Sequence, residues 1–221
     1  MSAVPVIAID GPSASGKGTD AQLVAGDLGF GYLNSGALYR LVALAAVRNG
    51  IPTSDEAAIA ALTVRLPTPR FEGEEILFEG RPVADAVRTE EVSTAASFVA
   101  ALPGVRAALL ERQRGFRRSP GLVAEGRDMG SVVFPDAVLK VFLTASPEAR
   151  AERRHKQLND KGIAATLPGL LQDLRERDAR DATRSVAPLK QSPGARLLDT
   201  TSLSAAQAAA LIVGWYRGAN G

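Results

Sequence analysis

A lysine and a threonine near the N-terminus stand in a glycine-rich segment whose spacing suits it to hold a phosphate. Residues 6–19 read V-I-A-I-D-G-P-S-A-S-G-K-G-T. Glycine tolerates positive φ and lets an anion come close to the main chain, whose N–H groups then point inward. In this pattern Lys17 bridges the β- and γ-phosphates of a nucleotide, and Thr19 is placed to hold Mg²⁺. The segment therefore predicts a site for a nucleoside triphosphate.

The phosphate-binding segment departs from the general pattern after its lysine. Gly18 separates Lys17 from Thr19, whereas the general pattern has Ser or Thr directly after the lysine. The ending G-K-G-T is typical of kinases of small molecules rather than of signalling GTPases or motor ATPases. The alternative is a glycine-rich turn that only joins a strand to a helix, but the flanking apolar strand and helical pattern favour phosphate binding. The residues expected at the nucleotide are Gly11, Pro12, Ser13, Ala14, Ser15, Gly16, Lys17, Gly18 and Thr19.

Two further polar motifs follow predicted strands directly. Ser35 and Arg40 come after a short strand, and Arg127 and Asp128 come after a buried one. Arginine can hold a phosphate with two hydrogen bonds, and aspartate can accept from a sugar or a base. Either motif alone would be read as a surface ion pair. Two of them at strand ends, beside a phosphate-binding loop, indicate a binding crevice.

Residues 175–184, R-E-R-D-A-R-D-A-T-R, carry an unusual density of charge. On a helix, Arg177, Asp181 and Arg184 stand at i, i+4 and i+7 and share one stripe. The preceding predicted helix adds Arg150, Arg153 and Arg154. A solvated, salt-bridged face is the alternative interpretation. Two arginine-rich helices joined by a loop at Lys161-Gly162 favour a lid that closes over transferring phosphates.

Strands and helices alternate along the chain and predict an α/β fold. The expected strands are residues 4–9, 32–33, 122–125, 138–143 and 196–199; the expected helices are 16–27, 37–49, 54–66, 89–101, 103–118, 147–159, 168–182 and one opened by Ser204 and Gln207. Parallel strands joined by helices form a doubly wound five-stranded sheet, whose ligands bind beyond the carboxyl ends of the strands. Residues 70–87 predict a small antiparallel β insertion.

Length and composition indicate the number of domains and exclude several classes of function. The 221 residues suffice for a single domain over residues 1–221, with the β insertion within 64–95 and a lid with its flanking helices over 150–184. The absence of cysteine excludes disulfides and thiolate chemistry. A net charge of +2 and 5% aromatic residues do not favour a nucleic-acid binder. With neither a secretory pattern nor a membrane-length apolar run, we expect a cytoplasmic monomer that contacts small molecules and no membrane.

Several stretches beyond the phosphate-binding loop carry a specific resemblance. They are S-G-A-L-Y-R, V-R-T-E-E-V, V-R-A-A-L-L-E-R-Q-R, E-G-R-D-M-G-S-V-V-F-P-D-A and R-D-A-R-D-A-T-R-S-V-A-P-L. In this order, over nearly the whole chain, they resemble the bacterial cytidylate kinases, a family of the nucleoside monophosphate kinase group of P-loop proteins. The β insertion is similar to that family's enlarged monophosphate-binding region. One position departs from the pattern, because Asn34 stands where the family usually has Asp.

The resemblance implies an activity and a set of residue roles. The activity is transfer of the γ-phosphoryl group of ATP to CMP or dCMP, with Mg²⁺. The resemblance implies that Ser35, Arg40, Arg127 and Arg184 hold the CMP phosphate, that Ser97, Arg106 and Asp128 read cytosine, and that Arg177 and Asp181 meet the sugar. Lys17, Arg127, Arg184 and the lid residues Arg153 and Arg154 would neutralise charge during transfer. A phosphate acceptor needs no general base, and the single histidine, His155, is expected to lie on the surface.

Other classes of function are weighed against this one. An adenylate- or shikimate-kinase-like enzyme of the same fold is the nearest alternative. A regulatory GTPase would carry an Asn-Lys-x-Asp motif, which the sequence lacks. A nucleic-acid-binding module could use the same arginines but would be expected to add aromatic stacking positions. The preference among CMP, dCMP and UMP, and the effect of Asn34, stay open at this point.

Overall fold

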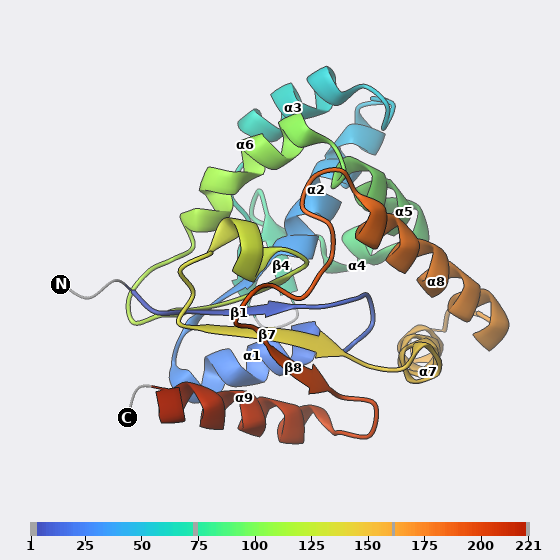
Figure 1. The fold of residues 1–221 in the computed structure, drawn as a ribbon. Coiled ribbons are helices and arrows are strands. Elements are labelled where there is room, and N and C mark those ends of the chain that lie inside the picture. Colours follow the sequence, from blue (N-terminus) through green and yellow to red (C-terminus); the bar gives the residue numbers. More distant parts are fainter. Residues whose placement is uncertain (1–3, 73–74, 161, 220–221) are drawn as a thin grey trace.

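A parallel five-stranded sheet lies at the centre of the molecule, within residues 4–72, 75–160 and 162–219, which the computed structural model describes (Figure 1). Its order is β2-β6-β1-β7-β8. The strands are β1 (Val6–Asp10), β2 (Gly31–Asn34), β6 (Leu122–Gly126), β7 (Leu139–Thr144) and β8 (Arg196–Asp199). All neighbouring strands are parallel. The predicted doubly wound α/β sheet is confirmed.

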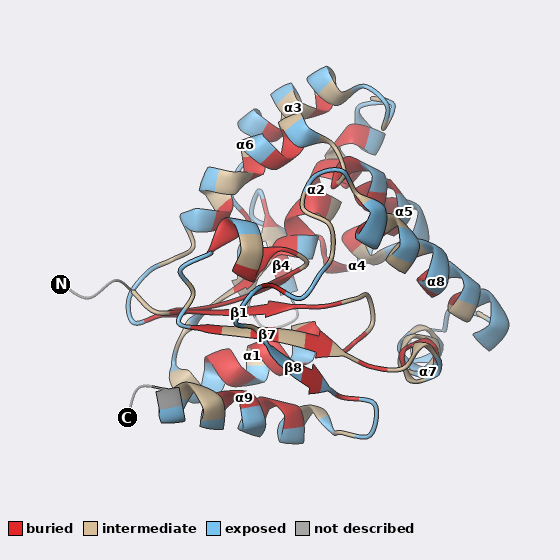
Figure 2. Cartoon of the chain, viewed as in Figure 1, coloured by how far each residue is buried: buried red, intermediate tan, exposed pale blue. Residues whose placement is uncertain are grey.

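Helices cover both faces of this sheet, because side chains alternate between the faces along each strand. On β1, Val6 and Ala8 belong to one buried cluster, and Ile7 and Ile9 belong to another. The described helices are α1 (Lys17–Leu28), α2 (Ser35–Arg48), α3 (Glu56–Arg65), α4 (Ala84–Arg88), α5 (Glu90–Val99), α6 (Pro103–Arg114), α7 (Pro147–Asn159), α8 (Leu167–Thr183) and α9 (Ala205–Ala219). Helices α1 and α9 cover one face, and α2 with its neighbours covers the other (Figures 1 and 2).

The β insertion forms a separate antiparallel sheet of β3 (Arg70–Glu72), β4 (Glu75–Phe78) and β5 (Arg81–Pro82). Phe71 joins it to the rest of the molecule, with its ring 6.1 Å from that of Tyr32 and 5.8 Å from that of Phe116. The predicted insertion ran to residue 87, but its last part is helix α4. Residues 73–74 of the predicted insertion lie outside the described residues.

The ends of several helices follow the capping chemistry of the sequence. Ser204 and Gln207 form the expected capping box before α9: the Ser204 amide donates to Gln207 Oε1 at 2.9 Å, and the Gln207 amide donates to Ser204 Oγ at 3.3 Å. A short π-helical turn, η1 (Met129–Val133), follows β6 and was not predicted. The η1 turn begins immediately after the Gly-Arg-Asp motif, so the position of its first residue determines where the motif ends.

Among the described residues, no single helix is long and apolar enough to cross a membrane. Helices α5 and α6 reach that length and composition only as a pair, and the pair is bent by 99°. Both helices contribute buried residues to the cluster that covers the sheet.

Candidate functional site

The loop between β1 and α1 has the backbone that the phosphate-binding motif requires. Gly11 follows the last residue of β1, where an added Cβ would lie only 2.0 Å from the carbonyl oxygen of Leu143. Ala14 and Gly16 both have positive φ, at 57° and 100°. Gly16 caps α1 in the left-handed conformation, which glycine adopts without the strain of a side chain. The amides of this loop and of the helix N-terminus are therefore turned toward the end of the sheet, where an anion is favoured.

Lys17 lies folded over this loop. Its Nζ donates to the carbonyl oxygen of Pro12 at 2.6 Å and to Ser15 Oγ at 3.4 Å. Burial, with the nearby charge of Arg127, lowers the pKa of Lys17 to about 7, although the negative charges of Glu125 and Asp10 oppose this shift. A buried ammonium with few anionic neighbours is stabilised when a phosphate arrives. The lysine thus suits the role that the sequence assigned to it.

A cluster of arginines lies beyond the same ends of the strands, held together by one buried aspartate. Asp181 Oδ2 accepts from Arg127 Nε at 2.8 Å, and Asp181 Oδ1 accepts from Arg184. Burial alone would raise the pKa of Asp181, but Arg127 and Arg184 hold it below its usual value. The aspartate therefore stays ionised and keeps two like charges close together.

Two more arginines reach the same region without a partner of their own. Neither Arg40 nor Arg177 has a hydrogen bond or ion pair within the described parts of the chain, and Arg177 Nε is a buried donor without an acceptor. Burial and neighbouring arginines lower the pKa of Arg40 to about 10 and that of Arg177 to about 9. Positive charge exceeds negative charge here, so an anion would stabilise the cluster.

A third group of predicted residues, Ser97, Arg106 and Asp128, is polar and buried. Arg106 Nη2 pairs with Asp128 Oδ2, and Arg106 Nη1 donates to the carbonyl oxygen of Ala100 at 3.2 Å. The guanidinium carbon lies 5.9 Å from the centre of the Tyr39 ring. Ser97 Oγ is buried without a hydrogen-bond partner. A buried polar atom without a partner is costly to the fold, which is consistent with a polar role for Ser97.

The arginines of α7 that were predicted to belong to a lid bond to the protein itself. Arg150 donates to the carbonyl oxygen of Ser13 at 3.2 Å and pairs with Asp178 of α8 at 2.6 Å. Arg153 donates to the carbonyl oxygen of Ser15 at 3.2 Å and also bonds to Thr200. Arg154 pairs with Glu90 at 3.4 Å. The bonds of Arg150 and Arg153 hold α7 against the phosphate-binding loop. The roles of Arg153 and Arg154 toward ATP stay predictions.

Other predicted site residues differ from expectation in detail. Arg184 lies just beyond α8, which ends at Thr183, so the predicted helical stripe is shorter by one residue. It still reaches Asp181, because that contact spans only three positions. Ser35 is buried at the first position of α2, and Asn34 caps that helix by accepting from the Ala37 amide at 2.9 Å. Lys161 of the predicted lid loop lies outside the described residues.

Sequence reasoning missed several buried acids near the site, and two of them, Asp10 and Glu125, lie at or near the ends of strands. Asp10 ends β1 and accepts from the amides of Met129 and Gly130 at 2.7 and 2.8 Å. Glu125 lies near the end of β6 and accepts from Tyr32 Oη at 3.3 Å. The available signal was an acid at the carboxyl end of a strand, directly before a glycine. Neither acid is explained by burial of apolar surface, so both serve the arrangement of the site.

The donor set fits a magnesium ion that arrives with a nucleotide. Within residues 4–72, 75–160 and 162–219, no group of three or more His, Cys, Asp or Glu residues could hold a metal by itself. Mg²⁺ usually keeps several waters and binds one or two protein ligands together with substrate phosphates. Thr19 has an exposed side chain in the first turn of α1, two residues after Lys17. Its hydroxyl is available for that purpose.

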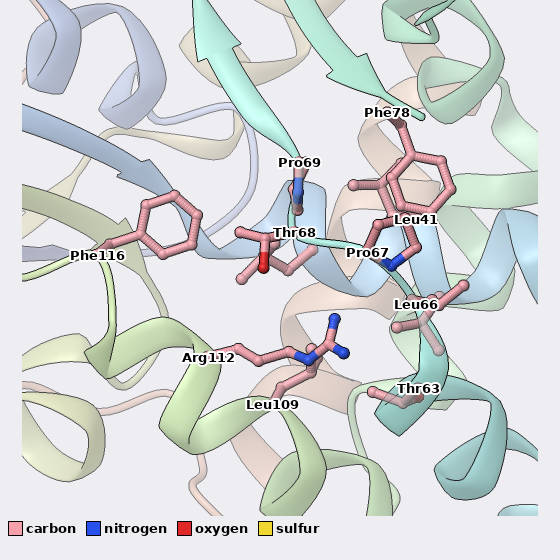
Figure 3. A pocket seen from close by; sticks show the side chains of 12 residues that line it. Leu41, Thr63, Leu66, Pro67, Thr68, Pro69, Phe78, Leu109, Arg112 and Phe116 are labelled. Carbon is pink, nitrogen blue, oxygen red and sulfur yellow. The ribbon is translucent and has the colours of Figure 1, made fainter. Parts of the chain in front are cut away.

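A separate cavity lies away from these residues, under the β insertion (Figure 3). It has a volume of about 20 Å³ and an apolar lining that includes Leu41, Leu66, Phe78 and Phe116. Such a volume holds about one water molecule. None of the predicted site residues lines it, so it does not belong to the site.

A phosphate-binding loop and a cluster of half-buried arginines meet beyond the carboxyl ends of one parallel sheet, which defines a P-loop phosphotransferase. The family described as Cytidylate kinase matches residues 7–217. The cytidylate kinase of Bordetella bronchiseptica is 57% identical over 97% of this chain and 96% of its own. Those of Polynucleobacter asymbioticus (57%, over 99% of both chains) and Chromobacterium violaceum (58%, over 96% of both) are equally similar. The chain belongs to the cytidylate kinase family.

Proposed function

We propose that the protein transfers the γ-phosphoryl group of ATP to CMP and to dCMP, giving ADP and CDP or dCDP. Family membership supports the kinase activity on CMP. The observation that carries the proposal is the arrangement of two separate cationic sites at one end of the sheet, Lys17 in its loop and the arginines around Asp181. One suits a triphosphate, and the other suits a monophosphate.

The proposed transfer needs no general base. An oxygen of the CMP phosphate forms a bond to the γ-phosphorus of ATP, and the bond from that phosphorus to the β,γ-bridging oxygen breaks to leave ADP. The acceptor oxygen is already ionised, so catalysis rests on alignment and on neutralising charge. Lys17 stabilises the charge on the β- and γ-phosphates, and Arg127 and Arg184 hold the acceptor. Mg²⁺, held through Thr19, supplies further neutralisation when bound.

The proposed contacts with the base come from the buried polar residues Ser97, Arg106 and Asp128, and those with the sugar come from α8. Arg106 and Asp128 form a preorganised pair whose remaining donor and acceptor atoms suit the polar edge of cytosine. Ser97 offers an unused hydroxyl beside them. Arg177 and Asp181 meet the sugar, and Ser35 and Arg40 join the other residues that hold the phosphate. Loss of the 2′-hydroxyl leaves those charged contacts in place, which supports use of dCMP.

The regions that surround the site have proposed roles as well. Residues 64–95 serve as the monophosphate-binding insertion, and residues 150–184 serve as the lid with its flanking helices, within one domain over residues 1–221. Helix α8 supports the second assignment, because it carries Arg177 and Asp181 and is tied to α7 through Arg150. We propose that the protein acts as a monomer in the cytoplasm.

A panel of phosphate acceptors tests the proposed function. Purified protein is mixed with Mg²⁺, ATP and one of CMP, dCMP, UMP, AMP or shikimate, and ADP formation is followed. The expected result is fast turnover with CMP and dCMP, slower turnover with UMP and none above background with AMP or shikimate. Turnover with a different acceptor alone would overturn the roles of Ser97, Arg106 and Asp128. Silence with every acceptor would overturn the kinase assignment.

A further inference from the structure

Asp10 makes a long-range contact that the transfer mechanism does not use. It is the last residue of β1, directly before the phosphate-binding loop, and only 4% of its surface is exposed. Its two carboxylate oxygens accept separately, Oδ1 from the Met129 amide at 2.7 Å and Oδ2 from the Gly130 amide at 2.8 Å. These amides open the η1 turn and belong to residues 119 and 120 positions further along the chain. The Asp10 side chain thus links the start of the phosphate-binding loop to the turn that follows the Gly-Arg-Asp segment.

The segment that Asp10 holds carries two residues of the acceptor site. Arg127 and Asp128 lie between the end of β6 and the first residue of η1, so their backbone has one fixed point on each side. On the β6 side the fixed point is the parallel pairing of Asp10 with Gly126. On the η1 side it is the pair of bonds to the Asp10 carboxylate. Both fixed points therefore depend on the same residue of β1.

Packing beneath the turn does not replace these bonds. Met129 is fully buried, and a Cβ at Gly126 would lie 3.0 Å from its side chain. This close packing limits movement toward the sheet, but it leaves the orientation of the Met129 and Gly130 amides to their acceptor. Two hydrogen bonds donated by these amides to one carboxylate define that orientation in a way that one bond cannot.

We infer that Asp10 is a positioning residue for the acceptor site, which sets Arg127 and Asp128 at the correct distance from the phosphate-binding loop. The inference rests on the proposed function, because it assigns these two residues to CMP. Asp10 acts by fixing the backbone of the Gly-Arg-Asp segment relative to β1. A small displacement of such groups is enough to slow a phosphoryl transfer.

The charge of Asp10 is suited to this task. Burial raises the pKa of Asp10 to about 6, although the two amides and Lys17 lower it and Asp128 raises it further. At neutral pH the carboxylate is therefore mostly ionised and accepts through both oxygens. An Asp10→Asn substitution keeps the shape but turns one acceptor into an N–H donor that faces another N–H. One of the two bonds is lost, and the turn must shift to relieve the conflict.

The test compares the two substrates in the Asp10→Asn variant. Titration calorimetry measures the dissociation constants of CMP and of a non-hydrolysable ATP analogue, and steady-state kinetics gives kcat and KM. We expect CMP binding and kcat/KM for CMP to fall by about 10-fold or more, the size of losing a charge-assisted hydrogen bond. Binding of the ATP analogue should weaken clearly less than binding of CMP, because Asp10 influences the phosphate-binding loop only through its charge near Lys17. A general disturbance of β1 and its loop would instead weaken both nucleotides alike, and that outcome would overturn the inference.

Asp55→Asn provides the matched control. Asp55 also accepts from a backbone amide, that of Ala58 at 3.0 Å, but it does so at the start of α3, and asparagine is an equally good cap. We expect this variant to match the wild type in both titrations.

A measurement on the wild-type protein keeps the inference testable even if Asp10→Asn does not fold. Amide hydrogen exchange at Met129 and Gly130 should be slow in the nucleotide-free protein, because Asp10 holds both groups before CMP binds. Exchange of both amides at the rate of an unprotected chain would overturn the inference. Failure of the wild type to phosphorylate CMP would overturn the proposed function instead, and it would leave the exchange result unaffected.

Discussion

The two phosphate sites proposed for this protein are built in opposite ways. The proposed site for the donor phosphates is one uninterrupted segment, in which a loop and the start of α1 supply Lys17 and the backbone amides. The proposed acceptor site takes its charged residues from α2, from α6, from the two residues that follow β6 and from α8 with the residue after it. A contiguous loop needs only local backbone geometry. The dispersed site needs buried acids, Asp181 and Asp10, to hold its cationic residues where they are.

The two sites also differ in how firmly they hold their charge. The pKa of Lys17 is lowered to about 7, so near neutral pH the donor site carries a partial charge that a bound phosphate would complete. The pKa values of Arg40 and Arg177 are lowered only to about 10 and about 9, so these residues stay cationic. Lysine thus supplies a charge that responds to the ligand, whereas arginine supplies a permanent one.

The largest expected effect comes from removing the cation of the donor site. Lys17→Ala should lower kcat at least ~10²-fold, the scale of losing one preorganised donor to the transition state. Initial rates of ADP formation with saturating CMP and ATP measure this. Lys190→Ala, which removes an exposed lysine, serves as the control and should leave kcat unchanged. Near-normal turnover in Lys17→Ala would remove the phosphate-binding loop from the mechanism.

A smaller effect sharpens the difference between lysine and arginine. At about pH 8 most Lys17 in the free protein is neutral, and bound phosphates should raise its pKa, so ATP binding should take up close to one proton. Proton uptake should decrease as the pH falls below 7, because Lys17 in the free protein is then already mostly protonated. Calorimetry in two buffers with different ionisation enthalpies measures the uptake. Lys17→Arg, which stays charged, should take up less, and an equal uptake in both proteins would contradict this assignment.

The same shift predicts the pH dependence of stability. The unfolded lysine binds its proton up to its ordinary pKa of 10.5, whereas the folded one releases it at about 7. Between these values the unfolded state binds more protons, so the contribution of Lys17 to the free energy of unfolding should increase as the pH rises. Urea unfolding of the wild type and of Lys17→Met at several pH values measures it. If the difference in the free energy of unfolding between the two proteins did not vary with pH, this would contradict the lowered pKa of Lys17.

The smallest expected effect lies outside both sites. Asp55→Ala removes the side chain that caps α3 and should lower the free energy of unfolding by about 1 kcal/mol. Because α3 contributes none of the proposed site residues, kcat and KM for both substrates should be unchanged. Urea unfolding and initial rates measure the two quantities. A change in KM for CMP alone would show that the acceptor site extends further than the comparison assumes.

The contrast between the sites explains what could be predicted from the sequence. The donor loop was predictable because nine consecutive residues, Gly11 to Thr19, carry its geometry. The parallel sheet followed from apolar runs such as residues 4–9, most of which form β1 and are buried on both faces of the sheet. The contacts of Asp181 were only partly predictable: its pairing with Arg184 is local, but that with Arg127 spans 54 positions.

The parts that were not predicted depend on contacts between distant elements. The bonds of Asp10 join β1 to residues more than a hundred positions away, and nothing local marks the partners. The η1 turn was missed because its i to i+5 bonding has no apolar period of its own. Helix α4 was read as part of the β insertion, since its five residues are too few to show a helical pattern.

Titration of both nucleotides into an Arg177→Gln variant tests the separation of the two sites most directly. Arg177 has no partner among the described residues, so its replacement breaks no ion pair that holds the fold. The account predicts that the dissociation constant of CMP rises about 10-fold or more, as for loss of a charge-assisted hydrogen bond, while that of an ATP analogue changes less than about 3-fold. An equal loss of affinity for both nucleotides, or a loss confined to the ATP analogue, would contradict it.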